Sequence, residues 1–444
     1  MSRFLSWGWT RFFLLFLCGA NMCFLWSHMH RSSYAIRPSP DHATAKPLTD
    51  LYPPWLAARE LLIHGRDPYG SYVTREIQIA YFGSELEETH AASLSDAQRF
   101  SLAYRFAYPL YAVFLVAPTI RMDFDEAQTV FVLFFSFTLC AGGSLWLGFV
   151  RPSIIAPEIA AVFAIFLSSI PVLQGLSLLQ PGLLVAALLA GTAYCACRGY
   201  LFLAGALLAV ATIRPQMALL TIAWFALWLS AAWSQRQSLF WGFVSTLAAL
   251  LFAAELLAPG WLLRYPHVLN LYASYTGAGS LLTLLMPVPV HRLLTVGALF
   301  IVAPFCWRTR HQPANSAPFA LATSFVLTLT VTIIPTVVAS FNQILLLPAI
   351  LLVIHHWGEL RRTRPLHIIS TAFSAISFLP WLLGIALTVE VVLHITRPWI
   401  SWMMLLNSSL ALPLVVFGWL VLLRHNTEGT PNIIEDVDLG LDAK

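Results

Sequence analysis

The segment from Ala127 to Val150 reads AQTVFVLFFSFTLCAGGSLWLGFV and contains no charged side chain. A helix needs roughly 20 apolar residues to cross the hydrocarbon core of a bilayer, and comparable apolar runs recur along most of the chain. Of the 444 residues, 58% are hydrophobic and 10% are charged, and the mean hydropathy is +0.74. Because the runs are continuous rather than alternating, they predict helices and not barrel strands. The composition therefore predicts an all-α, polytopic membrane protein.

The apolar runs outline the predicted spans. The first covers about residues 10–29, and Arg3 and Arg11 precede its apolar core. It lacks a small-residue cleavage site, so we interpret it as a retained signal anchor with its N-terminus inside. The segment 106–120 is short and bounded by prolines, and whether it crosses decides the orientation of every later span. The positive-inside rule favours a segment that dips in without crossing, with about twelve crossings and both ends cytoplasmic. The later runs lie near 126–150, 153–171, 182–197, 200–213, 215–233, 239–258, 285–306, 317–338, 343–357, 368–395 and 399–423.

The acidic residues indicate where the chain leaves the membrane. Nine of the 21 lie between Asp41 and Asp96, which predicts a polar insertion on the extracytoplasmic face. In the same topology, distant segments carrying polar groups reach that face: 178–182 (LLQPG), Arg214, the loop 261–280 and 340–343 (SFNQ). The predicted organisation in the cell membrane is a signal anchor (1–29), an extracytoplasmic loop bearing short amphipathic helices (30–105), a transmembrane helical bundle (106–424) and a disordered cytoplasmic tail (425–444).

Several kinds of site are not indicated by the sequence. Only Lys46 and Lys444 of the 25 basic residues are lysines, and the scattered arginines are typical of membrane-protein loops rather than of a nucleic-acid surface. The six cysteines lie almost entirely within apolar runs without metal-ligand spacing, so neither a disulfide framework nor a metal site is predicted. A Gly-rich phosphate loop and a dinucleotide fingerprint are both missing, which disfavours a nucleotide-driven pump and predicts no cofactor.

The polar stretch from Asp50 to Tyr69, DLYPPWLAARELLIHGRDPY, interrupts this apolar pattern. Prolines at a first turn and a glycine at the end predict a short amphipathic helix over 53–64, followed by a turn at Asp67-Pro68. Four of its apolar residues are expected to rest on the bilayer surface: Trp55, Leu56, Leu62 and Ile63. Asp50 then has two interpretations: an acid favoured near a helix N-terminus, or a general base for a hydroxyl at the membrane boundary.

Other polar residues at the ends of apolar runs are candidate substrate contacts. Arg214 is either a snorkelling arginine at a helix end or a guanidinium that binds a lipid-linked phosphate. Gln180 and the pair Asn342–Gln343 either join helices or hydrogen-bond a sugar. His267 is either a plain loop histidine or a substrate ligand.

The order of these motifs resembles the membrane-embedded GT-C glycosyltransferases of family 87. The stretch Asp50–Tyr69 is similar to the family's first-loop signature, and FAYPLYAVFLVAP (106–118) to its second block. Residues 178–220, with a Gln at a helix start and an Arg before Pro, resemble the central block, and SFNQILLLP (340–348) the late block. The likeness spans about residues 50–350.

The resemblance implies an extracytoplasmic hexosyltransferase, expected to invert the anomeric centre. Asp50 would be the general base, the donor a sugar such as mannose on a polyprenyl phosphate, and the acceptor a hydroxyl of a glycan or glycolipid, with the bilayer itself a partner. Family members often carry His where Gln343 stands, and Gln does not titrate. The candidate substrate-binding residues are Trp55, Arg59, Gln180, Arg214, Gln216, His267, Asn342 and Gln343.

Two other functions compete with this interpretation. A transporter or flippase of a lipid-linked sugar predicts repeats and interrupted helices in matching halves, and only the pair near 200–233 fits that pattern. A non-catalytic scaffold for envelope synthesis predicts that Asp50 is dispensable.

Overall fold

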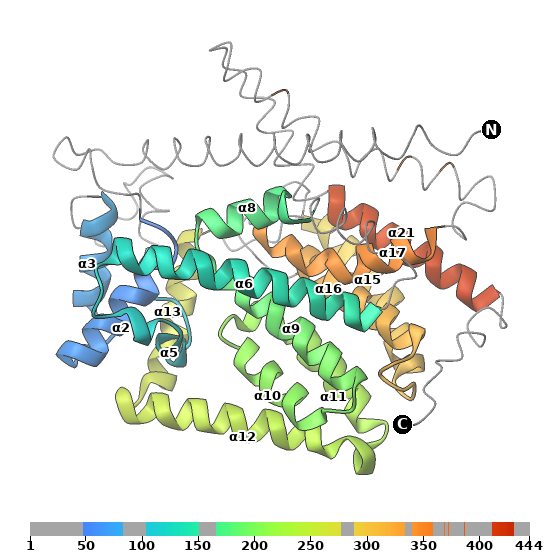
Figure 1. The fold of residues 1–444 in the computed structure, drawn as a ribbon, viewed down its shortest axis with the longest axis horizontal. Coiled ribbons are helices and arrows are strands. Elements are labelled where there is room, and N and C mark those ends of the chain that lie inside the picture. Colours follow the sequence, from blue (N-terminus) through green and yellow to red (C-terminus); the bar gives the residue numbers. More distant parts are fainter. Residues whose placement is uncertain are drawn as a thin grey trace.

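The computed structural model describes residues 48–82, 104–150, 166–276, 288–333, 340–357 and 411–429, with the single positions 368, 372 and 386. Within these ranges the chain forms 14 α-helices and three 3-10 helices, and no strand (Figure 1). The predicted all-α class is confirmed. The helices are α2 (Tyr52–His64), α3 (Ser71–Phe82), α5 (Val113–Val116), α6 (Phe124–Val150), α8 (Ile170–Ser177), α9 (Gly182–Cys197), α10 (Leu201–Ala211), α11 (Pro215–Ser230), α12 (Trp233–Leu257), α13 (Trp261–Thr276), α15 (Val288–Thr309), α16 (Ala317–Ile333), α17 (Leu347–His355) and α21 (Leu412–Gly429).

Three stretches of helix in the described residues are long and apolar enough to cross a bilayer: α6, α12 and Arg292–Thr309 of α15. Several shorter apolar helices accompany them, among them α9, α11 and α16. These elements indicate a membrane protein. The count of about twelve crossings stays a prediction, because the runs at 10–29 and 368–395 and most of 153–171 lie outside the described residues.

The segment 106–120 is not one helix. It forms three consecutive short turns: η3 (Leu110–Ala112), α5 and η4 (Ala117–Thr119). Ten residues that rise at most about 2 Å each cover roughly 20 Å, less than the roughly 30 Å hydrocarbon core. The helical part of the segment is therefore too short to cross alone, and the topology of 106–120 stays a prediction.

Helices α6, α9, α10 and α12 pack side by side in that order, with α6 and α12 on opposite sides of the layer in Figure 1. The closest approach is between α10 and α12, where Gly205 of one helix and Gly242 of the other are buried against the partner backbone. A Cβ atom at Gly205 would overlap the carbonyl oxygen of Leu239, and one at Gly242 would overlap that of Phe202. Two glycines therefore set the spacing of these helices.

Helix α16 organises the other half of the bundle, with α11, α15, α17 and α21 packed around it. Trp224 of α11 donates its indole N–H to Thr323 Oγ1 at 3.1 Å, and Trp228 contacts Phe319 at a ring-centroid distance of 5.2 Å. At the far end of α11, the buried Arg236 guanidinium donates to the Trp228 and Arg310 carbonyls. An arginine fork thus satisfies carbonyls that the helix ends leave unpaired.

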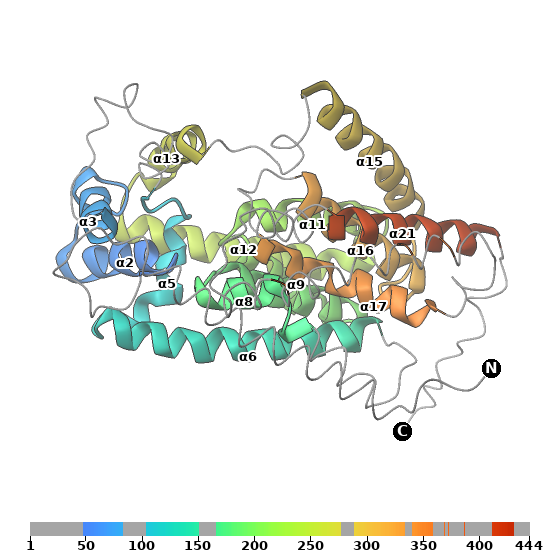
Figure 2. The same ribbon diagram turned by 90° about the horizontal axis from the view of Figure 1, so that it is seen from above.

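Helices α2, α3, α5 and α13 gather at one end of the molecule, as Figures 1 and 2 agree. Helix α2 has the predicted prolines in its first turn, and Gly65 ends it with φ +67°, where Arg66 N–H donates to Glu60 O. The prediction that this helix rests on the bilayer surface is wrong for Trp55 and Leu56. Trp55 and Leu56 are buried against protein, and only Ile63 is strongly exposed. Because η4 and α5 cover it, α2 belongs to the protein core.

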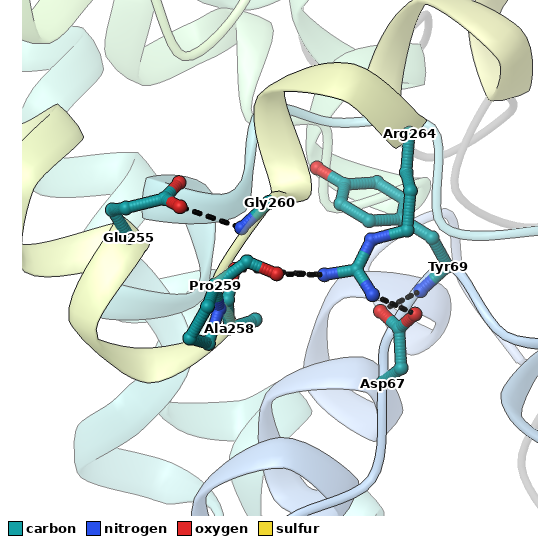
Figure 3. A network of polar contacts seen from close by, with 7 residues as sticks. All are labelled: Asp67, Tyr69, Glu255, Ala258, Pro259, Gly260 and Arg264. Carbon is teal, nitrogen blue, oxygen red and sulfur yellow. Dashed lines mark hydrogen bonds and ion pairs between the residues drawn. The ribbon is translucent and has the colours of Figure 1, made fainter.

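The predicted loop 261–280 is also wrong for its first part, since residues Trp261–Thr276 form helix α13 despite Pro266. Figure 3 shows how this helix is held against the turn after α2. Arg264 pairs with Asp67 at 2.9 Å and donates to Pro259 O at 3.0 Å, while Asp67 Oδ1 accepts the Tyr69 backbone N–H. The predicted Asp67-Pro68 turn is confirmed, and it ties α2 to α13.

Candidate functional site

Asp50 immediately precedes α2, but its carboxylate does not cap that helix. The N-cap residue is Leu51, and no side chain caps the helix. The Asp50 backbone N–H instead donates to Leu178 O at 3.1 Å, and its carboxylate accepts a hydrogen bond from Gln180 Nε2. The start of α2 is therefore attached to the turn between α8 and α9, 130 residues further along the chain. This geometry disfavours a simple helix-terminal role for Asp50.

Gln180 is placed by an unusual backbone conformation. Leu179 has φ +49°, the only positive φ of a non-glycine residue in the described ranges. Leu178 N–H still closes a helical bond to Gln174 O, while Gln180 N–H reaches back to Gly175 O at 2.9 Å. A left-handed leucine is strained, and such strain is found at sites where the surrounding structure fixes it. Here it directs the Gln180 side chain, which is only 2% exposed, toward Asp50.

Arg214 occupies the turn between α10 and α11, at the N-cap position of α11. Its Nη1 donates to Gln180 Oε1 at 3.0 Å, and its guanidinium lies 5.4 Å from the centre of the Phe341 ring. A Cβ atom on Gly182 would stand 2.7 Å from Nη1, so the glycine leaves room for the guanidinium. The arginine is thus turned into the protein and does not snorkel along a helix end.

Asp50, Gln180 and Arg214 form a hydrogen-bonded chain of three side chains, the Asp50 chain. In it the Gln180 amide bridges the Asp50 carboxylate and the Arg214 guanidinium. The described contacts contain no direct ion pair between Asp50 and Arg214. Burial raises the pKa of Asp50 to about 6, and the nearby Arg214 charge opposes that rise. An acid with a pKa close to the working pH is suited to accept and release protons.

Neutral tyrosines surround this chain from three other segments: Tyr81 of α3, Tyr104 and Tyr108 before η3, and Tyr272 of α13. Burial, together with the Asp50 charge, raises the pKa of Tyr104 and of Tyr108 to about 12. The Tyr81 hydroxyl donates to Thr49 O at 2.6 Å, and its ring lies 4.5 Å from that of Tyr104. Among the residues that the structure describes, Arg214 is thus the charged group that acts on Asp50 in an aromatic-lined site.

Asn342 and Gln343 lie in η5 (Ser340–Leu346), directly after the Phe341 ring that contacts Arg214. Both are nearly fully buried, at 3% and 4% exposed. Both polar atoms of the Asn342 amide and Oε1 of Gln343 have no hydrogen-bond partner among the residues that the structure describes. Buried unpaired amides are costly, so they mark a place where a polar ligand would be stabilised.

Four predicted substrate contacts do not join the Asp50 chain. Trp55 is buried and donates to Thr119 O at 3.2 Å, and Arg59 lies over its ring at 5.2 Å. Gln216, half-buried in the first turn of α11, makes no hydrogen bond with Asp50, Gln180 or Arg214. His267 is exposed on α13 rather than in a loop. A substrate role for these four residues stays a prediction.

We expect Trp55→Phe to lower thermal stability while leaving the site intact. The change removes the indole hydrogen bond to the buried Thr119 carbonyl, which keeps the Met122 N–H as a second donor, so the expected loss is about 0.5–1.5 kcal/mol. Thermal unfolding in detergent, followed by intrinsic fluorescence, measures the loss. If Trp55 were a substrate contact, the variant would instead change substrate affinity at unchanged stability.

Sequence reasoning missed Phe341 and the tyrosines. Aromatic residues are common throughout this chain, so no spacing rule separated the four site tyrosines from those in the core. The one available signal was the position of Tyr81, Tyr104 and Tyr108 in the polar insertion or directly after it, and Tyr272 in α13 lacked even that signal. The described residues also hold no group of three or more His, Cys, Asp or Glu side chains that would bind a metal ion.

Comparison with known proteins gives no relative: no family, curated protein or solved structure matches this chain.

Proposed function

We propose that this protein is a membrane-embedded glycosyltransferase that moves a sugar from a polyprenyl-phosphate donor to a hydroxyl acceptor. The observation that carries the proposal is the chain Asp50–Gln180–Arg214, which holds a carboxylate of raised pKa beside a guanidinium. A base and a phosphate-binding cation are the two groups that such a displacement needs. The site belongs to helix ends and the α2–α3 region, outside the long apolar helices.

Asp50 acts as the general base. As the acceptor oxygen attacks the anomeric carbon, its proton moves to the Asp50 carboxylate. The new carbon–oxygen bond forms while the bond from that carbon to the donor phosphate oxygen breaks. The electron pair of the broken bond stays on the phosphate. Attack from the side opposite the leaving group inverts the anomeric centre.

Arg214 stabilises the leaving phosphate. Its planar fork presents several N–H donors that match phosphate oxygens. Helices α9 and α11, each 16 residues long, begin beside Gln180 and at Arg214, so their N-terminal dipoles also favour an anion there. The Asn342 amide and Gln343 Oε1, which are unpaired among the described residues, are available to hydrogen-bond sugar hydroxyls in a substrate that reaches η5.

A carrier of lipid-linked sugars remains the second candidate, because a buried acid with a raised pKa also suits proton-coupled transport. The two functions differ in product. The test uses purified protein in nanodiscs, a polyprenyl-phosphate donor labelled in its sugar, and a panel of glycan and glycolipid acceptors. The transferase forms a labelled acceptor product. Proton-dependent movement of the intact donor across proteoliposomes, with no product from any acceptor, would support the carrier instead.

The pH dependence of transfer follows from the state of Asp50. A base works only when ionised, and with a pKa of about 6 it is roughly nine-tenths ionised at pH 7 and one-tenth at pH 5. We therefore expect kcat/KM to fall about tenfold per pH unit below pH 6. An initial-rate profile between pH 4.5 and 8, with enzyme stability checked at each pH, measures it. A rate that is flat down to pH 5 would contradict this role.

A further inference from the structure

Both ends of the Gln180 side-chain amide make hydrogen bonds within the site. Its amide N–H₂ faces the Asp50 carboxylate, and its amide oxygen faces the Arg214 guanidinium at 3.0 Å. The residue is only 2% exposed and is held by the left-handed backbone of Leu179. An amide carries no charge and does not titrate, so it separates the two charged groups without exchanging protons.

We propose that Gln180 is a positioning residue that keeps the Asp50 carboxylate from closing onto the Arg214 guanidinium. Without the amide between them, a flexible arginine would form a direct, bidentate ion pair with the carboxylate. That ion pair would engage both groups. The Asp50 carboxylate would bind Arg214 instead of the acceptor hydroxyl, and the guanidinium could no longer bind the donor phosphate. This role rests on the proposed transfer reaction, but the contact itself can be tested without any substrate.

Charges around Asp50 make the test interpretable. Among the described residues, Arg214 is the charged group that acts on the Asp50 carboxylate, and the Asp50 charge in turn raises the pKa values of Tyr81, Tyr104, Tyr108 and Tyr272. The carboxyl band of Asp50 can be followed by infrared difference spectroscopy across a pH titration. The Asp50→Asn protein provides the subtraction that isolates this one group.

Two substitutions at Gln180 have opposite expected effects. Gln180→Ala empties the space between the two charges, so Arg214 closes on the Asp50 carboxylate. The titration midpoint of Asp50 should then fall by about 1–3 pH units. Gln180→Met keeps the volume but removes the donor, so the ionised carboxylate loses a hydrogen bond and the midpoint should rise. A second change, Arg214→Met on the Gln180→Ala background, should reverse the fall. That double variant separates closure of the ion pair from entry of water.

The outcomes are distinct. The positioning role is supported if the Asp50 midpoint falls in Gln180→Ala, rises in Gln180→Met and returns toward the wild-type value in the double variant. A rise with both single substitutions would make Gln180 a simple hydrogen-bond donor and overturn the proposal, as would a fall that persists without Arg214. Sugar transfer is measured in parallel and should decrease in both single variants. If wild-type protein transfers no sugar, the proposed function fails while the titration still decides the role of Gln180.

Discussion

Replacing Asp50 by Asn is expected to reduce sugar transfer by about 10²–10⁴-fold, the contribution of a positioned general base. The amide retains the size of the carboxylate and an oxygen that accepts the Gln180 hydrogen bond, but it cannot take the acceptor proton. The measurement is formation of labelled product by purified protein in nanodiscs, with donor and acceptor both in excess. The decrease should fall on kcat, because the substrates are bound by other residues.

The same substitution should leave the fold intact. The pKa of Asp50 is raised in the folded protein, so this group favours folding below pH 3.8, and that contribution is lost as the pH rises through about 6. At pH 7 the wild-type protein holds an ionised buried carboxylate, whereas the Asn variant does not. We therefore expect the Asn variant to be at least as stable as wild type at pH 7 and to lose this pH dependence. Thermal unfolding at pH 5 and pH 7 measures both effects.

Asp67→Asn is the matched control. It makes the same chemical change at an acid in the same 50–69 stretch, where Asp67 pairs with Arg264 rather than lying in the Asp50 chain. Transfer by this variant should stay within a few-fold of wild type, since partly exposed ion pairs contribute about 0–1 kcal/mol. Equal losses in both variants would indicate a general structural effect and remove Asp50 from the mechanism. Full transfer by Asp50→Asn would do the same.

Much of the fold could be predicted because backbone polar groups in the hydrocarbon core must be paired within their own segment, which requires helices. The apolar run at 182–197 predicted both bounds of α9 correctly, and the run beginning at Pro215 predicted the start of α11. Charge counting predicted that Asp50, Gln180, Arg214 and SFNQ lie on one face, and the structure brings Asp50, Gln180, Arg214 and the Phe341 ring of SFNQ into contact. The orientation of that end relative to the membrane stays a prediction.

The errors come from contacts that no local pattern encodes. The aliphatic face of α2 is equally suited to lipid and to protein, and only the packing of η4 and α5 shows that it meets protein. The bridging geometry of Gln180 depends on Leu179, whose left-handed backbone nothing in a leucine predicts. The hydrogen bond from the Trp55 indole to Thr119 O could not be predicted either, because it joins residues 64 positions apart.

The second large effect is expected at the glycine contact between α10 and α12. In Gly205→Ala, the added methyl would overlap Leu239 O and stand 2.7 Å from Phe243 N, and both atoms belong to backbone that cannot rotate away. The helices must separate, so we expect a loss of about 1–3 kcal/mol or more, the cost of overpacking a well-packed interior. Thermal unfolding in nanodiscs measures it, and proteolysis of the α10–α12 region should quicken.

Gly242→Ala should destabilise the protein similarly, because its methyl would meet the Phe202 backbone. The double variant should lose less than the sum of the two single losses, since the first methyl already separates the helices that the second would separate. Gly297→Ala is the control: this glycine also lies within a helix, α15, but no atom lies within 4 Å of its added Cβ. Alanine is the better helix former there, so stability should be unchanged or slightly higher. Losses of equal size at Gly297 and Gly205 would show that helical glycine, and not the α10–α12 contact, governs stability.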